Sequence, residues 1–170
     1  MGWPLGHRRC DEHAITSSHL ARTPSIPPPP RPPMTLDSLV AWVEDVPDLA
    51  LRWSKVLPRT DSSYVWSQAT RRGTILLPQA LESCPRECKC TLAHEIGHHF
   101  TLRVCNGYPW HRSMALARNE SLARRIAVAL LVPGDRVQRL SSARLVDDLC
   151  DEWDVMPDVV EMVMWMVGAQ

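Results

Sequence analysis

The sequence predicts an α+β domain that is mostly helical and contains a small antiparallel sheet. Two short β-rich runs, SSYVWS (62–67) and GTILLP (73–78), are bounded by turn residues, and WSKVL (53–57) is a weaker third. Apolar residues recur at helical spacing before and after these runs. With 170 residues, of which 45% are hydrophobic, the chain can bury the core of one domain, and one catalytic domain is the most that it carries.

Residues 1–33 are predicted to be a disordered arm. They contain eight of the fifteen prolines, among Ser, Thr, His and Arg, so this segment buries too little apolar surface to offset its ordering entropy. A Pro-rich arm that docks on a partner is the alternative. A regular pattern begins at Met34, which is a candidate translation start, and residues 34–170 form the predicted folded domain.

Three longer helices are expected. Leucine and valine recur at helical spacing from Leu36 to about Leu51, where Thr35 or Asp37 can provide the N-cap. A second helix should begin near residues 83–85 and run through Phe100. A third should span about residues 113–131 and stop at Pro133-Gly134. Two or three short helices fill the remainder.

The charge distribution argues against nucleic-acid binding. Nineteen basic residues balance nineteen acidic ones, so the whole chain has no electrostatic attraction for nucleic acid or an anionic membrane. The segment CDEWDVMPDVV (150–160) fits a helix-turn-helix, but the chain from Arg144 onward has one basic residue and seven acidic ones. Phosphates repel such a surface, so we expect no direct DNA binding.

The C-terminal helical pair is therefore expected to be structural, or to offer a face to a basic protein partner. Its apolar stripe, Val159, Met162, Val163 and Met166, is expected to belong to the core. A surface that holds a substrate helix together with Trp165 is the alternative.

The cysteine pattern favours reduced thiols in a cytoplasmic protein. Cys84, Cys88 and Cys90 form C-x3-C-x-C, which lacks a fourth zinc ligand at suitable spacing. No signal-peptide pattern and no run of about 20 apolar residues is present, so we expect neither export nor a membrane span. Seventeen arginines against two lysines indicate a GC-rich bacterial or phage genome.

The segment TLAHEIGHHF (91–100) carries the main functional signal. His94 and His98 are four residues apart, so on a helix both imidazoles can reach one metal ion. Glu95 lies beside them, where it can take a proton from a water that the ion activates. HExxH alone is a weak signal, which a chain of this length shows by chance roughly once in fifty to a hundred cases.

The residues around this motif favour a buried metal helix. Leu92, Ile96 and Phe100 form an apolar row that faces away from His94, while Gly97 leaves room for another backbone near the histidines. A buried histidine pair without metal would need other hydrogen-bond partners, and none lies nearby in the sequence.

Glu120 is the favoured third ligand. It is the one acidic residue between His98 and Asp135, and Ala123 and Ala127 share its helical face. The alternative motif HExxHxxGxxH is excluded because Thr101 and Val104 occupy its Gly and third His positions. The other candidate ligands are His99, Cys105 and His111.

Tyr108 and His111 are candidates for stabilising the oxyanion that forms when water attacks a peptide carbonyl. Both follow the first metal-binding helix. An ordinary loop role is the alternative for each.

The two segments TLAHEIGHHF and NESLARRIAVALLVP (119–133) resemble the ImmA/IrrE family of small metallopeptidases, in which HExxH is followed by a pattern close to ExxAxx(F/W)AxxLLxP. The resemblance covers about residues 37–165, and Ile126 stands at the aromatic position. CPRECKC (84–90) has no counterpart in the family pattern. The matching residues of the second segment are Glu120, Ala123, Ala127, Leu130, Leu131 and Pro133.

The resemblance implies a zincin-like fold in which His94, His98 and Glu120 bind zinc, or alternatively manganese, and Glu95 is the general base. It also implies a cytoplasmic protein substrate, usually a helix-turn-helix repressor of a phage, mobile element or stress regulon. The predicted function is thus that of a metal-dependent endopeptidase. The alternative is a non-catalytic regulator that binds a transcription factor through the same fold.

Overall fold

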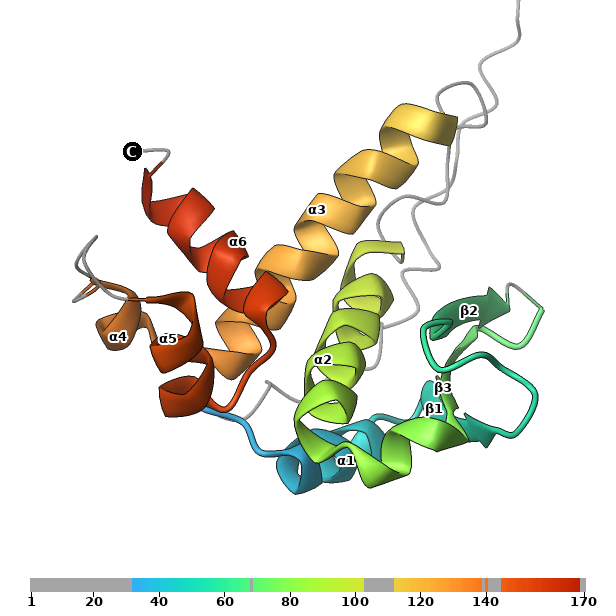
Figure 1. Ribbon diagram of the computed structural model, residues 1–170. Coiled ribbons are helices and arrows are strands. Elements are labelled where there is room, and N and C mark those ends of the chain that lie inside the picture. The colour runs from blue at the N-terminus through green and yellow to red at the C-terminus, as the bar shows by residue number, and fades with distance from the viewer. Residues whose placement is uncertain (1–31, 68, 103–111, 139, 141–144, 169–170) are drawn as a thin grey trace, which may run out of the picture.

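Six α-helices and a three-stranded sheet make up the part of the chain that this computed structural model describes, residues 32–67, 69–102, 112–138, 140 and 145–168 (Figure 1). The predicted α+β class with a small sheet is confirmed. All but the last two residues of the predicted disordered arm lie outside the described residues.

The first helix, α1 (Leu36–Asp45), is shorter than predicted. It begins as expected, because the Thr35 hydroxyl accepts a hydrogen bond from the Ser38 backbone N–H at 3.2 Å. It ends at Asp45 instead of near Leu51. Pro47 disfavours a helical conformation for the residue before it, and Val46 is accordingly extended, with φ −84° and ψ 111°.

The sheet is mixed, so the prediction of an antiparallel sheet is only partly right. Strand β3 (Arg72–Pro78) lies between β2 (Ser63–Ser67), which pairs with it antiparallel, and β1 (Leu49–Ser54), which pairs with it parallel. Because the β2–β3 hairpin occupies one edge of β3, β1 adds to the opposite edge. Ile75 and Leu77 of the central strand are completely buried.

Helix α2 (Pro85–Leu102) lies between the sheet and α3 (Arg112–Leu131), and contacts both (Figure 1). Helix α2 follows a 3-10 turn, Gln79–Ser83. Helices α2 and α3 each begin and end within about two residues of the predicted positions. No α2 residue from 88 to 101 is exposed, and Leu92, Ala93 and Ile96 are completely buried. The predicted burial of this helix on both sides is confirmed.

Three shorter helices complete the described chain: α4 (Gly134–Gln138), α5 (Val146–Trp153) and α6 (Pro157–Gly168). Asp154, in a left-handed conformation with φ 53° and ψ 48°, ends α5 and starts the predicted turn. Val159 and Val163 are buried and Met162 and Met166 are partly buried, which confirms this stripe as core, whereas Trp165 is 61% exposed. Within the described ranges, no helix is long and apolar enough to cross a lipid bilayer.

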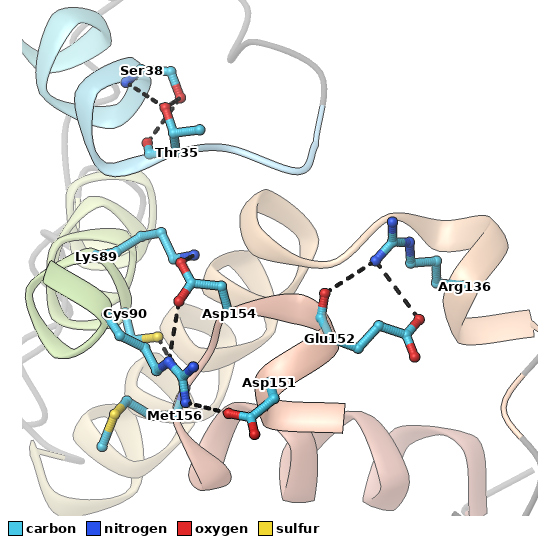
Figure 2. A network of polar contacts seen from close by, with 10 residues as sticks. Thr35, Ser38, Lys89, Cys90, Arg136, Asp151, Glu152, Asp154 and Met156 are labelled. Atoms are coloured by element: carbon cyan, nitrogen blue, oxygen red, sulfur yellow. Dashed lines mark hydrogen bonds and ion pairs between the residues drawn. The ribbon is translucent and has the colours of Figure 1, made fainter. Parts of the chain in front are cut away.

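Ion pairs attach the turn after α5 to α2 and join α4 to α5. Figure 2 shows the Lys89 ammonium against the Asp154 carboxylate, and Arg136 against Glu152. Arg86 of α2 also pairs with Asp154, at 3.1 Å. The acidic C-terminal segment thus uses part of its charge inside the molecule.

Candidate metal centre

His94 and His98 lie one turn apart on α2 and direct the same ring nitrogen toward each other. Their Nε2 atoms are 3.1 Å apart, and 25% and 19% of the two side chains are exposed. The i, i+4 spacing that the sequence showed therefore produces a pair of imidazoles that meet at one point.

Helix α3 brings Glu120 to this pair. Glu120 Oε1 lies 3.4 Å from His94 Nε2, and Oε2 lies 3.2 Å from His98 Nε2. Among the described residues, these three form the one group of His, Cys, Asp or Glu side chains whose ligand atoms all lie within 4.8 Å of one another. The group could hold a metal ion.

The two histidine nitrogens are close enough to share one zinc ion. Ligand atoms about 2.1 Å from zinc at tetrahedral angles are themselves about 3.4 Å apart, and the two Nε2 atoms are 3.1 Å apart. Each Glu120 oxygen lies near a different histidine, and the three ligand atoms of the cluster lie within 4.8 Å of one another. Both nitrogens and the carboxylate are ligand types that zinc accepts, so the residues fit such an ion.

Close packing of the two helices places Glu120 at this position. At Gly97, an added Cβ would lie 2.4 Å from the backbone oxygen of Ala123 and 2.8 Å from its Cα. Only glycine allows this approach, and the prediction that Gly97 leaves room for another backbone is confirmed. Glu120 precedes Ala123 by three residues, so it shares the face of α3 that turns toward α2.

Glu95 is buried beside the cluster, with only 3% of the residue exposed. The Ser62 hydroxyl donates to its Oε1 at 2.7 Å, while the buried Oε2 has no hydrogen-bond partner among the described residues. Burial raises the pKa of Glu95 above its usual value, although the Ser62 hydrogen bond acts in the opposite direction. A carboxylate with one oxygen anchored and the other unpartnered is suited to accept a proton.

His94 is also affected by its surroundings. Burial lowers the pKa of His94 more than the nearby Glu120 carboxylate raises it, and His98 lowers it further. Its neutral form is therefore favoured, and the neutral imidazole is the form that binds metals.

The three residues of the cluster and Glu95 line a cavity of about 740 Å³. Ser63 and Tyr64 of the edge strand β2 line it together with Glu95, and Asn119 of α3 lines it as well. The cavity gives a substrate access to the cluster and to the buried carboxylate at the same time.

His99, a candidate ligand in the sequence, does not join the cluster. It is completely buried, and its Nδ1 lies 2.9 Å from the Tyr64 hydroxyl while its Nε2 lies 4.0 Å from Asp48. Tyr64 reaches it by crossing Gly73, where a Cβ would lie 2.4 Å from the tyrosine oxygen. His99 thus ties α2 to the sheet behind the metal cluster.

The other candidates lie outside the described residues. These are Cys105 and His111 as ligands, and Tyr108 and His111 as oxyanion stabilisers.

The cysteines ahead of the motif form no metal cluster in the described chain. Cys84, Cys88 and Cys90 are free thiols. Burial raises the pKa of both Cys88 and Cys90 to about 11, so both are protonated at neutral pH. Cys90 Sγ accepts a hydrogen bond from the Met156 backbone N–H at 3.3 Å, which favours a structural role.

The sequence analysis missed two neighbours of the site. Ser62 comes from the loop before β2, 33 residues from Glu95, and no local pattern indicates such a contact. Arg124 donates to Glu120 Oε1 at 3.0 Å, and its i+4 spacing from Glu120 could have identified that pair.

No protein-family model matches the chain, and neither does any curated protein sequence.

Proposed function

We propose that the protein is a metal-dependent endopeptidase of the ImmA/IrrE kind, with zinc as the metal and manganese as the alternative. One observation carries the proposal: His94, His98 and Glu120, whose ligand atoms lie within 4.8 Å of one another, line the same cavity as the buried residue Glu95. A site that only bound a partner would have no need for a proton acceptor at this place.

The chemistry divides between the metal and Glu95. A divalent ion held by His94, His98 and Glu120 would polarise the scissile carbonyl and make a water molecule more acidic. The Glu95 carboxylate accepts the proton of the attacking water while the Ser62 hydroxyl holds its Oε1 in place. The water oxygen bonds to the carbonyl carbon, the C–N bond breaks, and Glu95 passes the proton to the leaving nitrogen.

The proposed substrate is a cytoplasmic protein, a helix-turn-helix repressor by the resemblance of the two motifs. A protease that acts on such a substrate needs no DNA contact of its own. The acidic C-terminal helices, seven acidic residues to one basic from residue 144 onward, are consistent with that division of roles.

Glu95→Gln tests the proposal. The amide keeps the shape of the side chain and can still accept from Ser62, but it cannot take a proton, so cleavage should fall by about 10²- to 10⁴-fold. The assay is cleavage of candidate repressors on co-expression, with zinc content measured on the purified protein. Glu82→Gln, at an exposed position, is the matched control and should cleave normally.

Metal content separates the two halves of the proposal. Wild type and Glu95→Gln should each bind one zinc ion per chain, whereas His94→Ala/His98→Ala should bind none. Equal cleavage by wild type and Glu95→Gln would refute the mechanism. Full zinc occupancy in the double mutant would show that His94 and His98 do not bind the zinc ion.

A further inference from the structure

A second cavity, of about 370 Å³, adjoins the candidate metal centre. It shares His94 and Glu120 with the centre, and its walls come from α2, α3 and α6. A peptide whose scissile carbonyl lies at the metal centre would therefore place a neighbouring side chain at or in this cavity.

Part of the lining of this cavity is apolar. Ala127 and Val128 of α3 and Val159 and Met162 of α6 line it, together with Met156 from the turn before α6. Ala127 lies two turns after Glu120 on the same face of α3, so its small side chain leaves space directly beyond the proposed ligand. Methionine is unbranched and flexible, which allows the wall to fit around an inserted group.

The basic residues that line the cavity are not free to bind an acidic group. Arg59 pairs with Glu87, and Arg124 pairs with Glu120. Ser62, which also lines the cavity, donates to Glu95. The apolar side chains of α3 and α6, with Asp158 among them, are therefore the main contacts that the lining offers to an inserted group.

We infer that this cavity receives one large aliphatic side chain, such as leucine or methionine, from the substrate residue next to the cleaved bond. The inference rests on the proposed function. The volume lies within the range of small-molecule sites, about 300–1,000 Å³. A whole substrate helix is a poorer match, because Val163 of the same stripe is completely buried within the fold.

Binding of two small zinc ligands to the zinc-loaded protein provides the test. Leucine hydroxamate and glycine hydroxamate carry the same metal-binding group and differ in the side chain that would enter the cavity. By calorimetry, the leucine compound should bind at least about tenfold more tightly, as expected for burial of one aliphatic side chain.

Two variants change the cavity in opposite directions. Ala127→Leu should remove the preference for leucine hydroxamate, because its own side chain fills the space. Met162→Ala should enlarge the cavity and favour phenylalanine hydroxamate over leucine hydroxamate. Met166→Ala is the matched control: it is a partly buried methionine one turn further along α6 that does not line the cavity, and it should keep the wild-type preference.

The outcomes distinguish the inference from the proposed function. Equal binding of the leucine and glycine compounds to wild type, or an unchanged preference in Met162→Ala, would overturn the side-chain pocket and leave the metal centre intact. If Ala127→Leu does not fold, Met162→Ala decides alone. Zinc-loaded wild type that binds neither compound would contradict the proposed function, and the pocket with it.

Discussion

Glu120 is the residue on which the proposed metal chemistry depends most. The two histidines come from adjacent turns of one helix, whereas Glu120 must arrive from another helix with both oxygens directed at them. In this structure Arg124 also bonds Oε1, so Glu120 has a partner on each side of its carboxylate. Its charge is what would complete a three-ligand site.

Glu120→Gln should therefore weaken zinc affinity by at least the 10- to 100-fold that loss of an outer-shell partner costs. The reason is that a neutral amide oxygen replaces an anionic donor. Competition with a chelator of known affinity measures the effect. Glu161→Gln, at an exposed position on α6, makes the same chemical change away from the site and should leave affinity within about twofold of wild type.

His111→Ala distinguishes Glu120 from the rival ligand and should leave zinc affinity unchanged. A large loss in His111→Ala, together with none in Glu120→Gln, would transfer the third ligand position to His111. The same measurement therefore decides between the two residues.

Among the secondary-structure elements, the α2–α3 crossing brings together the three residues of the candidate metal centre. Gly97 and Ala123 meet backbone to backbone, and this close approach is what allows a residue one turn earlier on α3 to reach His94 and His98. A wider separation of the two helices would move Glu120 away from the histidines.

Gly97→Ala should destabilise the protein by about 1–3 kcal/mol, the usual cost of overpacking a filled core. A loss of stability would be informative, because a Gly→Ala change inside a helix otherwise stabilises a protein by about 0.5–1 kcal/mol. Zinc affinity should fall in the same variant. Gly134→Ala is the control, since an added Cβ there meets nothing within 4 Å, and it should change the free energy of unfolding by less than about 0.5 kcal/mol in urea titrations.

Local patterns predicted the long helices well and the sheet less well. Apolar spacing and the flanking prolines located α2 and α3 because those signals lie within the helices themselves. The end of α1 was wrong because the effect of Pro47 on Val46 outweighed the apolar spacing that continued past it. The parallel pairing of β1 with β3 depends on contacts between distant segments, which periodicity does not encode.

The same distinction applies to the site. His94, Glu95 and His98 were predictable from spacing, and Glu120 from its position as the sole acidic residue on the next helix. Ser62 and the apolar cavity were not, because each depends on tertiary packing of segments far apart in the sequence.

At the scale of the whole molecule, ion pairs connect the C-terminal helices to α2. Lys89 is almost buried, with 8% of its side chain exposed, and its ammonium pairs with Asp154, whose side chain is 62% exposed. Asp154 also accepts from Arg86. These contacts connect the turn between α5 and α6 to α2 (Figure 2). Asp158, Val159 and Met162 of α6 line the cavity beside the candidate metal centre.

Asp154→Asn should lower the free energy of unfolding at pH 7 by about 1–2 kcal/mol. Loss of one partner of a buried ion pair costs about 3–5 kcal/mol, and the exposure of Asp154 reduces that figure. Asparagine tolerates the left-handed backbone at this position as well as aspartate does, so the variant isolates the loss of charge. Asp148→Asn, on the exposed side of α5, is the matched control.

The pH dependence of this difference tests its electrostatic origin. Partial burial would raise the pKa of Asp154, but hydrogen bonds from Lys89 and Arg86 outweigh it and keep the pKa below its usual range. A depressed folded-state pKa contributes stability that is complete well above the unfolded value of about 3.9 and is lost as the pH falls through the folded value. The difference in the free energy of unfolding between wild type and Asp154→Asn should thus be constant from about pH 5 to 7 and become smaller below about pH 4. Urea titrations with chelator present remove any effect of metal release at low pH. A gap that stays the same at pH 3 would show that Asp154 acts through its shape and backbone, and that the ion pairs do not hold the C-terminal helices in place.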